Sequence, residues 1–460
     1  MIPYPAYKST NLPWLPKIPE HWEAIKIREL FVERNQKVSD KDFAPLSVSK
    51  GGIVPQIATV AKTDNGENRK LVREGDFVIN SRSDRKGSSG ISSYDGSVSL
   101  INLVLRPRIA CNRRYLHYLL KSIPFVEEYY RNGRGIVADL WTTRYSEMKT
   151  ISIPFPSSDE QEQIVRYLDA MTAKINKLIR AKKKQIALLQ EQRQAIINQA
   201  VIRGLDPNAE MKDSGIDWLG KIPKHWILNK VGHFYQSILG KMLANTPSSP
   251  HDSFEKYLCA KDVHFDGVDL TDLKKMWFSP EEKMKYRVKP GDLLVVEGGA
   301  GAGGAAVFNG FSENLYVQNS IHIVRPKGNN TTVQFLYYWI YALVGRKYID
   351  FSCNKATIPH FTGDKLFEMP FVLAPLAEQK EIVNYLDIVC RKYDTIIDKL
   401  NNEINLSTEY KNSLISSVVT GQTDVRNIPV EDIIPDALIA EDDSTSEIEE
   451  EPTTSEESEE

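Results

Sequence analysis

The chain has 460 residues, 41% of them hydrophobic and 26% charged, and a formal net charge of −3. This length predicts two or more domains, and the composition is that of an ordinary globular protein. No apolar run is long enough to cross a membrane, and the N-terminus lacks the pattern of a signal peptide, so we expect a cytoplasmic protein with no membrane partner. The four scattered cysteines indicate neither disulfides nor a zinc site.

The net charge conceals an uneven distribution of charge. Residues 436–460 hold twelve of the 61 acidic residues and no Lys or Arg, so 49 acidic and 58 basic residues remain in residues 1–435. The body therefore carries about +9, which favours a polyanionic partner. The tail, rich in Glu, Ser and Thr, is expected to be disordered.

In chain order, the first segment is expected to be a strand-rich α/β domain. Residues 74–76 form a Gly-Asp turn that feeds an apolar strand, and a later strand ends at Arg106-Pro107. A short helix carrying Tyr115, Leu116 and Tyr118 follows these strands.

A long helix is predicted next, because residues 157–203 contain neither Gly nor Pro and Gly204 supplies a stop signal. Its apolar residues recur at spacings of four and three, which indicates a heptad seam that faces another helix. The seam residues are Ile164, Leu168, Met171, Ile175 and Leu178.

The same elements then occur a second time. Residues 160–169 (EQEQIVRYLD) return as residues 378–387 (EQKEIVNYLD), within a second predicted helix from Leu376 to Thr420 that stops at Gly421. The same offset gives a second seam, formed by Ile382, Leu386, Val389, Tyr393 and Ile396. A two-helix coiled coil accounts for both seams. The simpler alternative, the core of a helical domain, conflicts with the polar distal half of the first helix.

The segments before the two helices also resemble one another. Residues 18–22 (IPEHW) match residues 222–226 (IPKHW), and the turn at residues 290–292 and the Arg325-Pro326 strand end match those of the first segment. A helix carrying Phe335, Leu336 and Tyr338 completes the correspondence. We expect Trp22 and Trp226 to be core anchors, with His21 and His225 as their structural partners. The whole unit, an α/β (α+β) domain followed by a long helix, is therefore present in two copies.

The loops after the two Gly-Asp turns differ. The first is rich in Arg and Lys, whereas residues 298–304 of the second are mostly Gly. The Gly-rich run lacks the Lys and Ser/Thr of a phosphate-binding loop, so a tight hairpin is expected. No nucleophile, metalloprotease or amino-methyltransferase motif occurs, and we identify no catalytic residue, metal ligand or cofactor site in this chain.

Taken together, these motifs resemble the specificity subunit of Type I restriction-modification enzymes. The resemblance rests on residues 218–226 (WLGKIPKHW), on the approach to Glu-Gln at residues 153–161 and 374–379, and on the doubled order of domain then helix. It covers the chain to about Gly421. The segment before Glu160 lacks the usual apolar residue, and the acidic tail is not expected of the family.

The resemblance implies two target recognition domains, at residues 1–156 and 205–375, each contacting one half of a bipartite double-stranded DNA site. Two conserved helices, at residues 157–204 and 376–421, would form an antiparallel coiled coil with pseudo-twofold symmetry and hold the domains apart, and residues 422–460 would form the acidic tail. Two modification subunits would supply adenine methylation with S-adenosylmethionine. Restriction subunits would supply translocation and cleavage with ATP and Mg²⁺.

Base reading requires Arg, Lys, Asn, Gln, Ser or Thr on loops that reach the groove edges. The candidates in the first domain are Arg82, Arg85, Lys86, Arg134 and Arg144. In the second domain they are Lys241, Asn354, Lys355, Thr357 and His360. Solvated surface charge is the alternative for each residue. Two other functions stay open: a nucleotide-binding enzyme that uses the Gly298–Gly304 loop, and a coiled-coil adaptor without DNA readout.

Overall fold

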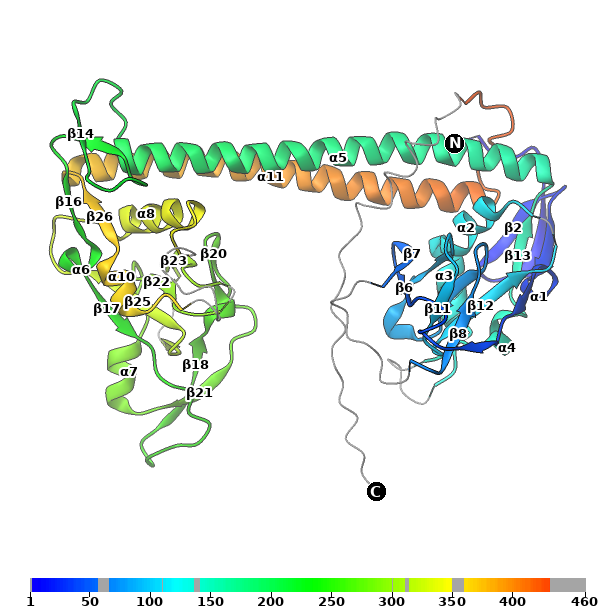
Figure 1. Ribbon diagram of the computed structural model, residues 1–460, viewed down its shortest axis with the longest axis horizontal. Helices are drawn as coiled ribbons and strands as arrows, with labels where there is room; N and C mark the ends of the chain where they lie inside the picture. The colour runs from blue at the N-terminus through cyan, green and yellow to red at the C-terminus, as the bar shows by residue number, and fades with distance from the viewer. Residues whose placement is uncertain are drawn as a thin grey trace. The chain divides into compact units, whose positions relative to one another are not determined.

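The computed structural model describes residues 2–56, 66–109, 111–135, 141–299, 301–310, 314–349 and 360–430. The chain divides into two compact units, the first formed by Met1–Lys183 with Asn401–Glu460 and the second by Lys184–Leu400. Each unit is described by itself (Figure 1). The predicted acidic tail (residues 422–460) begins later than expected, because residues 422–430 pack on the first unit: Val425 is buried in its core, and the Asp424 amide donates to the Ile2 carbonyl at 2.7 Å. Residues 431–460 lie outside the described residues.

The first unit is built on a four-stranded antiparallel sheet in the order β10-β9-β12-β4. Its strands are β10 (Ser89–Ile91), β9 (Phe77–Asn80), β12 (Asn102–Pro107) and β4 (Phe31–Glu33). Smaller sheets pair β1 (Tyr7–Leu12) with β2 (Leu15–Pro19), β3 (Glu23–Lys26) with β13 (Ser152–Phe155), β6 (Leu46–Ser49) with β7 (Gly52–Pro55), and join β11 (Gly96–Val98), β8 (Arg69–Val72) and β5 (Lys37–Val38). The helices are α1 (Ile27–Leu30), α2 (Arg113–Lys121), α3 (Ile123–Arg131) and α4 (Tyr145–Met148).

The second unit has a four-stranded sheet of corresponding order, β23-β22-β25-β17. Its strands are β23 (Ala305–Val307), β22 (Leu293–Val296), β25 (Ile321–Pro326) and β17 (Tyr235–Leu239). Smaller sheets pair β14 (Met211–Asp213) with β15 (Lys221–Pro223), β16 (Ile227–Lys230) with β26 (Pro370–Leu373), β19 (Val263–His264) with β20 (Gly267–Val268), and join β21 (Lys275–Phe278), β18 (Ser253–Leu258) and β24 (Leu315–Val317). The helices are α6 (Val231–Phe234), α7 (Pro280–Tyr286), α8 (Val333–Gly345) and α10 (Gly363–Glu368).

A buried ion pair fixes the start of the central strand in each unit. The Gly-Asp turns place a glycine at φ 87° before β9 and before β22, a conformation that favours glycine. The following Asp76 accepts from Arg34 Nε at 2.7 Å, and Asp292 accepts from Arg325 Nε at 2.6 Å. The turn predicted at both places is confirmed.

The central sheet of the first unit buries both of its faces, as its continuous apolar strands require. Ile79 and Leu103 pack with α2 and α3, whereas Val78 and Val104 pack with residues of β6, β8 and β11. The second unit shows the same alternation: Val295 faces the core that contains α8, and Leu294 faces the core that contains β18 and β24. Each unit therefore combines helices with a mostly antiparallel sheet.

Two long helices occupy the expected places, α5 (Ser158–Arg203) and α11 (Leu376–Val419). Each ends before a glycine of positive φ, Gly204 at 75° and Gly421 at 74°. In the first unit Lys411 Nζ donates to Asn176 Oδ1 at 3.0 Å, and in the second unit Arg193 pairs with Asp394. Lys182 pairs with Glu403 in the first unit as well, so later residues of α5 meet earlier residues of α11 there and the two helix halves run antiparallel.

The seam residues differ in burial. Buried are Ile164, Leu168, Ile175, Ile382 and Leu386; partly buried are Met171, Val389, Tyr393 and Ile396. Leu178 departs from the expected stripe with 48% exposure, and Ile179 packs against the core in its place. A straight helix of 3.6 residues per turn drifts by about 20° per heptad from a 3.5-residue repeat, so the buried stripe leaves the predicted positions as the helix proceeds.

A buried glutamine ties the start of each long helix to the adjoining α/β domain. Gln161 Nε2 donates to the Pro156 carbonyl at 2.9 Å, and its Oε1 accepts from the backbone of Asn112, which caps α2, at 3.1 Å. Gln379 Oε1 likewise accepts at 3.1 Å from the backbone of Thr332, which caps α8. This amide therefore couples two helix N-termini.

The preceding glutamate binds the Pro-x-His-Trp motif. Glu160 lies 2.8 Å from His21 Nε2, and Glu378 lies 2.7 Å from His225 Nε2 and accepts from Trp226 Nε1 at 2.8 Å. Both tryptophans have 0% exposure. The two histidines are thus structural contacts of the anchors, as the sequence indicated.

The end of the other long helix meets the same motif. A Cβ on Gly204 would lie 3.2 Å from the Trp226 ring, and one on Gly421 would lie 3.0 Å from the Trp22 ring and 2.3 Å from Pro19 Cδ. In each unit the tryptophan therefore packs close to the end of one long helix, while the start of the other binds its motif.

We predict that Gln379→Ala lowers the stability of the second unit by about 1–3 kcal/mol, because it leaves buried backbone groups without hydrogen bonds. The measurement is urea unfolding, with hydrogen exchange of the Thr332 amide as a local reading. Gln185→Ala, at an exposed site on α5, is the matched control. Equal midpoints for both variants would contradict the anchoring role of Gln379.

Candidate nucleic-acid interface

Three segments of the first unit meet at Thr142. Isolated β-bridges pair Thr142 with Arg82 on one side and with Arg134 on the other. The Thr143 amide donates to the Ser81 carbonyl at 2.9 Å, and the Arg134 amide donates to the Thr142 carbonyl at 3.1 Å. Directly opposed residues of antiparallel segments project to the same face. The fold thus brings together two arginines that are far apart in the sequence.

Arg144 lies two residues beyond Thr142, and we call Arg82, Arg134 and Arg144 the arginine cluster. The Arg82 side chain is 47% exposed with Asp84 at 3.8 Å, and that of Arg134 is 84% exposed with Glu147 at 3.6 Å. Arg144 is exposed as well. Such long, exposed ion pairs neutralise a guanidinium only weakly. The cluster therefore offers donors and positive charge to a partner.

The other two candidates of this loop, Arg85 and Lys86, are less exposed than Arg82. Arg85 ends a 3₁₀ turn, η1 (Ser83–Arg85), and its carbonyl accepts from the Tyr130 hydroxyl at 3.3 Å. Tyr130 also donates to the Asn80 carbonyl at 3.0 Å, so it holds the loop at both ends. Lys86 Nζ lies 2.6 Å from Glu127. Arg82 has the most exposed side chain of the three, at 47% against 43% for Lys86, and Arg85 is partly buried.

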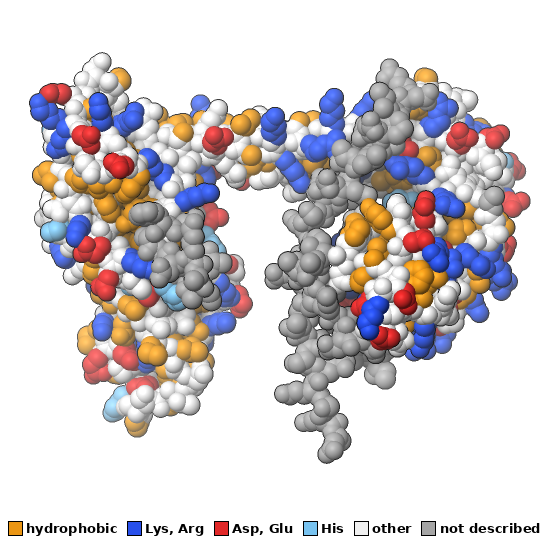
Figure 2. Space-filling model, in the orientation of Figure 1, with side chains coloured by type: hydrophobic (Ala, Val, Ile, Leu, Met, Phe, Trp, Pro, Cys, Tyr) orange, Lys and Arg blue, Asp and Glu red, His pale blue; other side chains and the backbone are white. Residues whose placement is uncertain are grey.

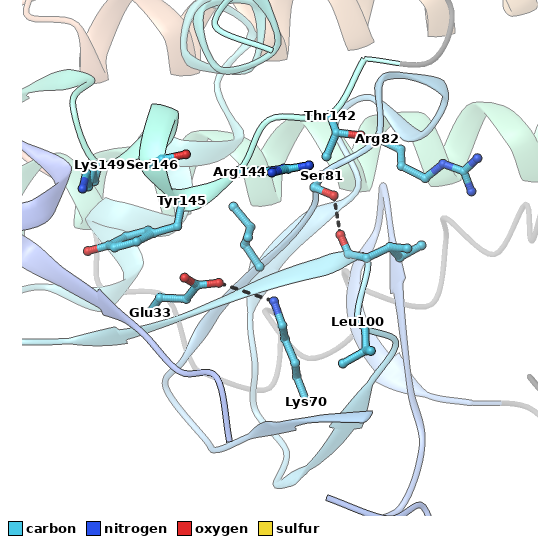
Figure 3. A pocket seen from close by; sticks show the side chains of 12 residues that line it. Glu33, Lys70, Ser81, Arg82, Leu100, Thr142, Arg144, Tyr145, Ser146 and Lys149 are labelled. Carbon is cyan, nitrogen blue, oxygen red and sulfur yellow. Dashed lines mark hydrogen bonds and ion pairs between the residues drawn. The ribbon is translucent and has the colours of Figure 1, made fainter. Parts of the chain in front are cut away.

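A hollow of about 730 Å³ lies beside the arginine cluster (Figure 3). Its lining comprises Glu33, Lys70, Ser81, Arg82, Leu100, Ile101, Leu103, Thr142, Arg144, Tyr145, Ser146 and Lys149. Figure 3 shows Lys70 directed at Glu33, its partner at 3.4 Å, and Ser81 directed at the Ile101 carbonyl. Four basic residues against one acidic residue make this edge suitable for an anionic or acceptor-rich ligand.

The second unit has the same framework at the corresponding edge. Glu297 follows β22 as Ser81 follows β9, and Gly298 pairs with His360 in an isolated bridge as Arg82 pairs with Thr142. The Phe361 amide donates to the Glu297 carbonyl at 2.6 Å, which corresponds to the bond between Thr143 and Ser81. The backbone is alike, but the side chains differ.

The remaining candidates of the second unit fall in different places. His360 is exposed at the edge just described. Lys241 instead donates to the Trp277 carbonyl at 2.7 Å and to Glu282 at 2.5 Å, with its side chain 13% exposed. This ammonium group has a structural role, because it is already paired inside the unit. Asn354, Lys355 and Thr357 lie outside the described residues.

Sequence reasoning did not select Thr142, Lys70 or Glu297 for this edge. The number of residues that separates the two Gly-Asp turns also separates Ser81 from Glu297, so the sequence alone shows that these two residues are equivalent. Thr142 meets Arg82 only through a bridge across 60 positions of sequence, for which no local pattern exists.

The Gly-rich loop forms the expected hairpin, with β22 and β23 paired from Leu293–Val307 to Val295–Ala305. Its amides of Ala302, Gly303 and Gly304 donate to carbonyls of the hairpin itself. Within the described ranges, no group of three or more His, Cys, Asp or Glu side chains is placed to hold a metal ion. In the same part of the chain, no helix is long and apolar enough to span a membrane.

Comparisons with known proteins agree with this architecture. The chain is 22% identical over 433 residues to the EcoKI specificity subunit of Escherichia coli K12, covering 88% of this chain and 90% of that protein. It is 21% identical over 437 residues to the MjaVIII specificity subunit of Methanocaldococcus jannaschii, covering 90% and 95%. A solved structure described as showing complex assembly and conformational transition of the type I R-M system aligns with a TM-score of 0.64 at 16% identity, covering 88% of this chain and 99% of that one.

The profile of the Type I restriction modification DNA specificity domain matches residues 19–188 and 275–406. These ranges include more than half of the chain, and they contain the arginine cluster, the Glu297 edge and most of both long helices. The chain therefore belongs to the family of Type I restriction-modification specificity subunits.

Proposed function

We propose that this chain reads a bipartite double-stranded DNA target, one half with each α/β domain. It directs adenine methylation by modification subunits and cleavage by a restriction subunit, in the cytoplasm. The observation that carries the proposal is the pair of equivalent edges, Ser81 to Arg82 and Glu297 to Gly298, with matching backbone bonds and different side chains. A shared framework with exchanged side chains suits two readers of different sequences. Mapping methylated adenines after coexpression with a modification subunit tests it.

Electrostatics supports DNA as the partner. The residues before the acidic tail carry an excess of basic over acidic residues, and the arginine cluster is exposed beside a hollow whose charged lining residues are four basic and one acidic. Arginine forms bidentate hydrogen bonds with the O6 and N7 acceptors of guanine in the major groove. The first domain therefore has the chemistry for both phosphate attraction and base reading.

The long helices support docking of two modification subunits, and we propose that they pair as an antiparallel coiled coil. Leu188 on α5 and Leu406 on α11 are 50% and 59% exposed, and the offset that relates Glu160 to Glu378 also relates these two leucines. Figure 2 shows hydrophobic side chains among basic ones along the visible side of α5. One surface present twice suits two copies of one partner. S-adenosylmethionine, ATP and Mg²⁺ would be bound by the partner subunits.

The two alternative functions predict other behaviour. A nucleotide-binding enzyme needs loop amides that face a phosphate, but three amides of the Gly-rich loop donate within the hairpin. An adaptor without readout would leave methylation independent of DNA sequence. ATP binding by the isolated chain would favour the first alternative, and unselective methylation by the complex would favour the second.

The first prediction for this function concerns the independence of the two domains. Replacing residues 23–150 with the matching segment of another family member should change one half of the methylated motif and preserve the other, because each domain has its own core. The reciprocal exchange of residues 227–369 is the control and should change the other half. A change in both halves after either exchange would exclude separable reading.

The second prediction concerns the arginine cluster. If Arg82 binds guanine, Arg82→Ala should weaken DNA binding by about 1–3 kcal/mol and relax the base preference at one position of the motif. If Arg82 instead contacts a phosphate, the substitution should weaken binding to all sequences alike and lower the slope of log affinity against log salt concentration by about one. The same tests apply to Arg134 and Arg144. The measurement is DNA affinity of the assembled complex as a function of salt. Arg73→Ala, an exposed arginine at the other end of β9, is the matched control; equal effects would remove the cluster from the interface.

The third prediction concerns partner docking. Leu188→Asp or Leu406→Asp alone should each lose one modification subunit, and the double variant should lose both, because a charge enters an apolar contact. Native mass spectrometry of the assembled complex measures the copies bound. Leu270→Asp, at an exposed leucine away from both helices, is the control. Full occupancy in the double variant would show that the partners dock elsewhere.

A further inference from the structure

A buried histidine of the second unit lies between a serine and a glutamate. The His322 side chain is 3% exposed, on β25. Its Nδ1 lies 2.9 Å from Ser237 Oγ on β17, and its Nε2 lies 3.1 Å from Glu297 Oε2 at the end of β22. Burial lowers the pKa of His322 to about 4 and raises the pKa of Glu297. The imidazole is therefore neutral at neutral pH.

This polar group is incompletely satisfied within the described residues. His322 Nε2 and Glu297 Oε2 are both fully buried, and despite their short separation neither forms a hydrogen bond of acceptable geometry. Buried polar atoms in proteins are almost always hydrogen-bonded, and leaving one without a partner costs about 1–3 kcal/mol. The Glu297 side chain retains 17% exposure, so it also reaches the surface. Because Oε2 is fully buried, a donor from a ligand would meet this carboxylate at its other oxygen, Oε1.

The place of Glu297 in the fold indicates which ligand. Glu297 occupies in the second unit the place that Ser81 occupies in the first, and Gly298 occupies the place of Arg82. In the first unit, Ser81 lies beside the hollow and the arginine cluster. A Cβ on Gly298 would lie 2.8 Å from His360 Nδ1, so only glycine lets this imidazole lie against the strand end. The second unit thus replaces a donor-rich edge with one that carries a carboxylate next to an imidazole.

Donor and acceptor chemistry then separates the two edges. Arginine has donors only and suits the acceptors of guanine, whereas an ionised carboxylate has acceptors only. The major-groove donors of DNA are the N4 amino group of cytosine and the N6 amino group of adenine. Glutamate is therefore unsuited to guanine and thymine edges and suited to a base that bears an amino group.

We propose that Glu297, which lies 3.1 Å from His322 and beside His360, is a specificity-determining residue of the second domain and accepts a hydrogen bond from the exocyclic amino group of a base, in preference cytosine. This inference rests on the proposed function, because it requires the second domain to read DNA. The two half-sites are then read with opposite hydrogen-bond polarity at equivalent places of one framework.

The test is methylated-adenine mapping with the assembled complex of wild type, Glu297→Gln and Glu297→Ser. Ser is the residue at the equivalent place of the first unit, and Gln keeps the shape of Glu while it adds donors. We expect Glu297→Ser to relax one amino-bearing position of one half-site by about 10-fold to 100-fold, and Glu297→Gln to shift that position toward adenine, with the other half-site unchanged. Glu281→Gln, an exposed carboxylate on α7, is the charge-matched control.

Duplexes with base analogues identify the donor. At the relaxed position, 2-pyrimidinone in place of cytosine, or purine in place of adenine, removes only the amino group. Wild type should lose affinity for the analogue, and Glu297→Ser should bind both duplexes alike. An unchanged motif in both Glu297 variants, or equal sensitivity of wild type and variant to the analogue, overturns this inference. A wild-type complex without a two-part motif would instead overturn the proposed function.

Discussion

The structure depends on one buried constraint, the Glu-Gln pair that opens each long helix. Glu160 and Glu378 bind the Pro-x-His-Trp motif of their own unit, and Gln161 and Gln379 bind the backbone that caps α2 or α8. Glu160 and both glutamines are polar and buried, so their bonds are costly to break, whereas Glu378 is partly exposed. The helices are therefore fixed to the domains by directional contacts as well as by apolar packing.

This constraint explains why the compact units do not coincide with the order of the chain. The tryptophan of each motif packs near the glycine that ends one long helix, while the neighbouring histidine binds the glutamate that begins the other. A unit is thus complete only when the two antiparallel helix halves are both present. Removing either half would expose a buried indole and leave the glutamate or the glycine turn without its contacts.

The sequence was sufficient to predict those features that arise locally or from the repeat. The helix stops at Gly204 and Gly421, the Gly-Asp turns and the anchoring tryptophans are as predicted, because turn chemistry and glycine preference act over a few residues. Leu178 of the predicted seam is 48% exposed, since a straight helix does not keep a 3.5-residue period, and its place in a helix-pair or partner interface stays a prediction.

The candidate site was less predictable, because its residues are assembled by long-range bridges. The sequence predicts Arg82 from its place in the basic loop after the first Gly-Asp turn and Arg144 from its residue type, and the fold places both beside Thr142. Lys241 was chosen from its neighbouring glycine, yet an internal carboxylate and a carbonyl engage its ammonium group. Neither outcome follows from local pattern, because partners that lie 36 residues or more away in sequence are set by the tertiary fold.

The edges at Ser81 and Glu297 are joined to the fold by backbone hydrogen bonds, so the side chains that would contact DNA are not the groups that stabilise the edge. The bonds from Thr143 to Ser81 and from Phe361 to Glu297 join backbone atoms, so they place no demand on the side chains that project from the edge. The framework bonds of Asp76 and Asp292, in turn, lie at the opposite end of the central strand. Substitutions at the edge therefore cost the fold little, apart from positions such as Gly298, where a neighbouring ring occupies the space of a Cβ. A scaffold of this kind permits one domain to present donors and the other to present acceptors at the same place.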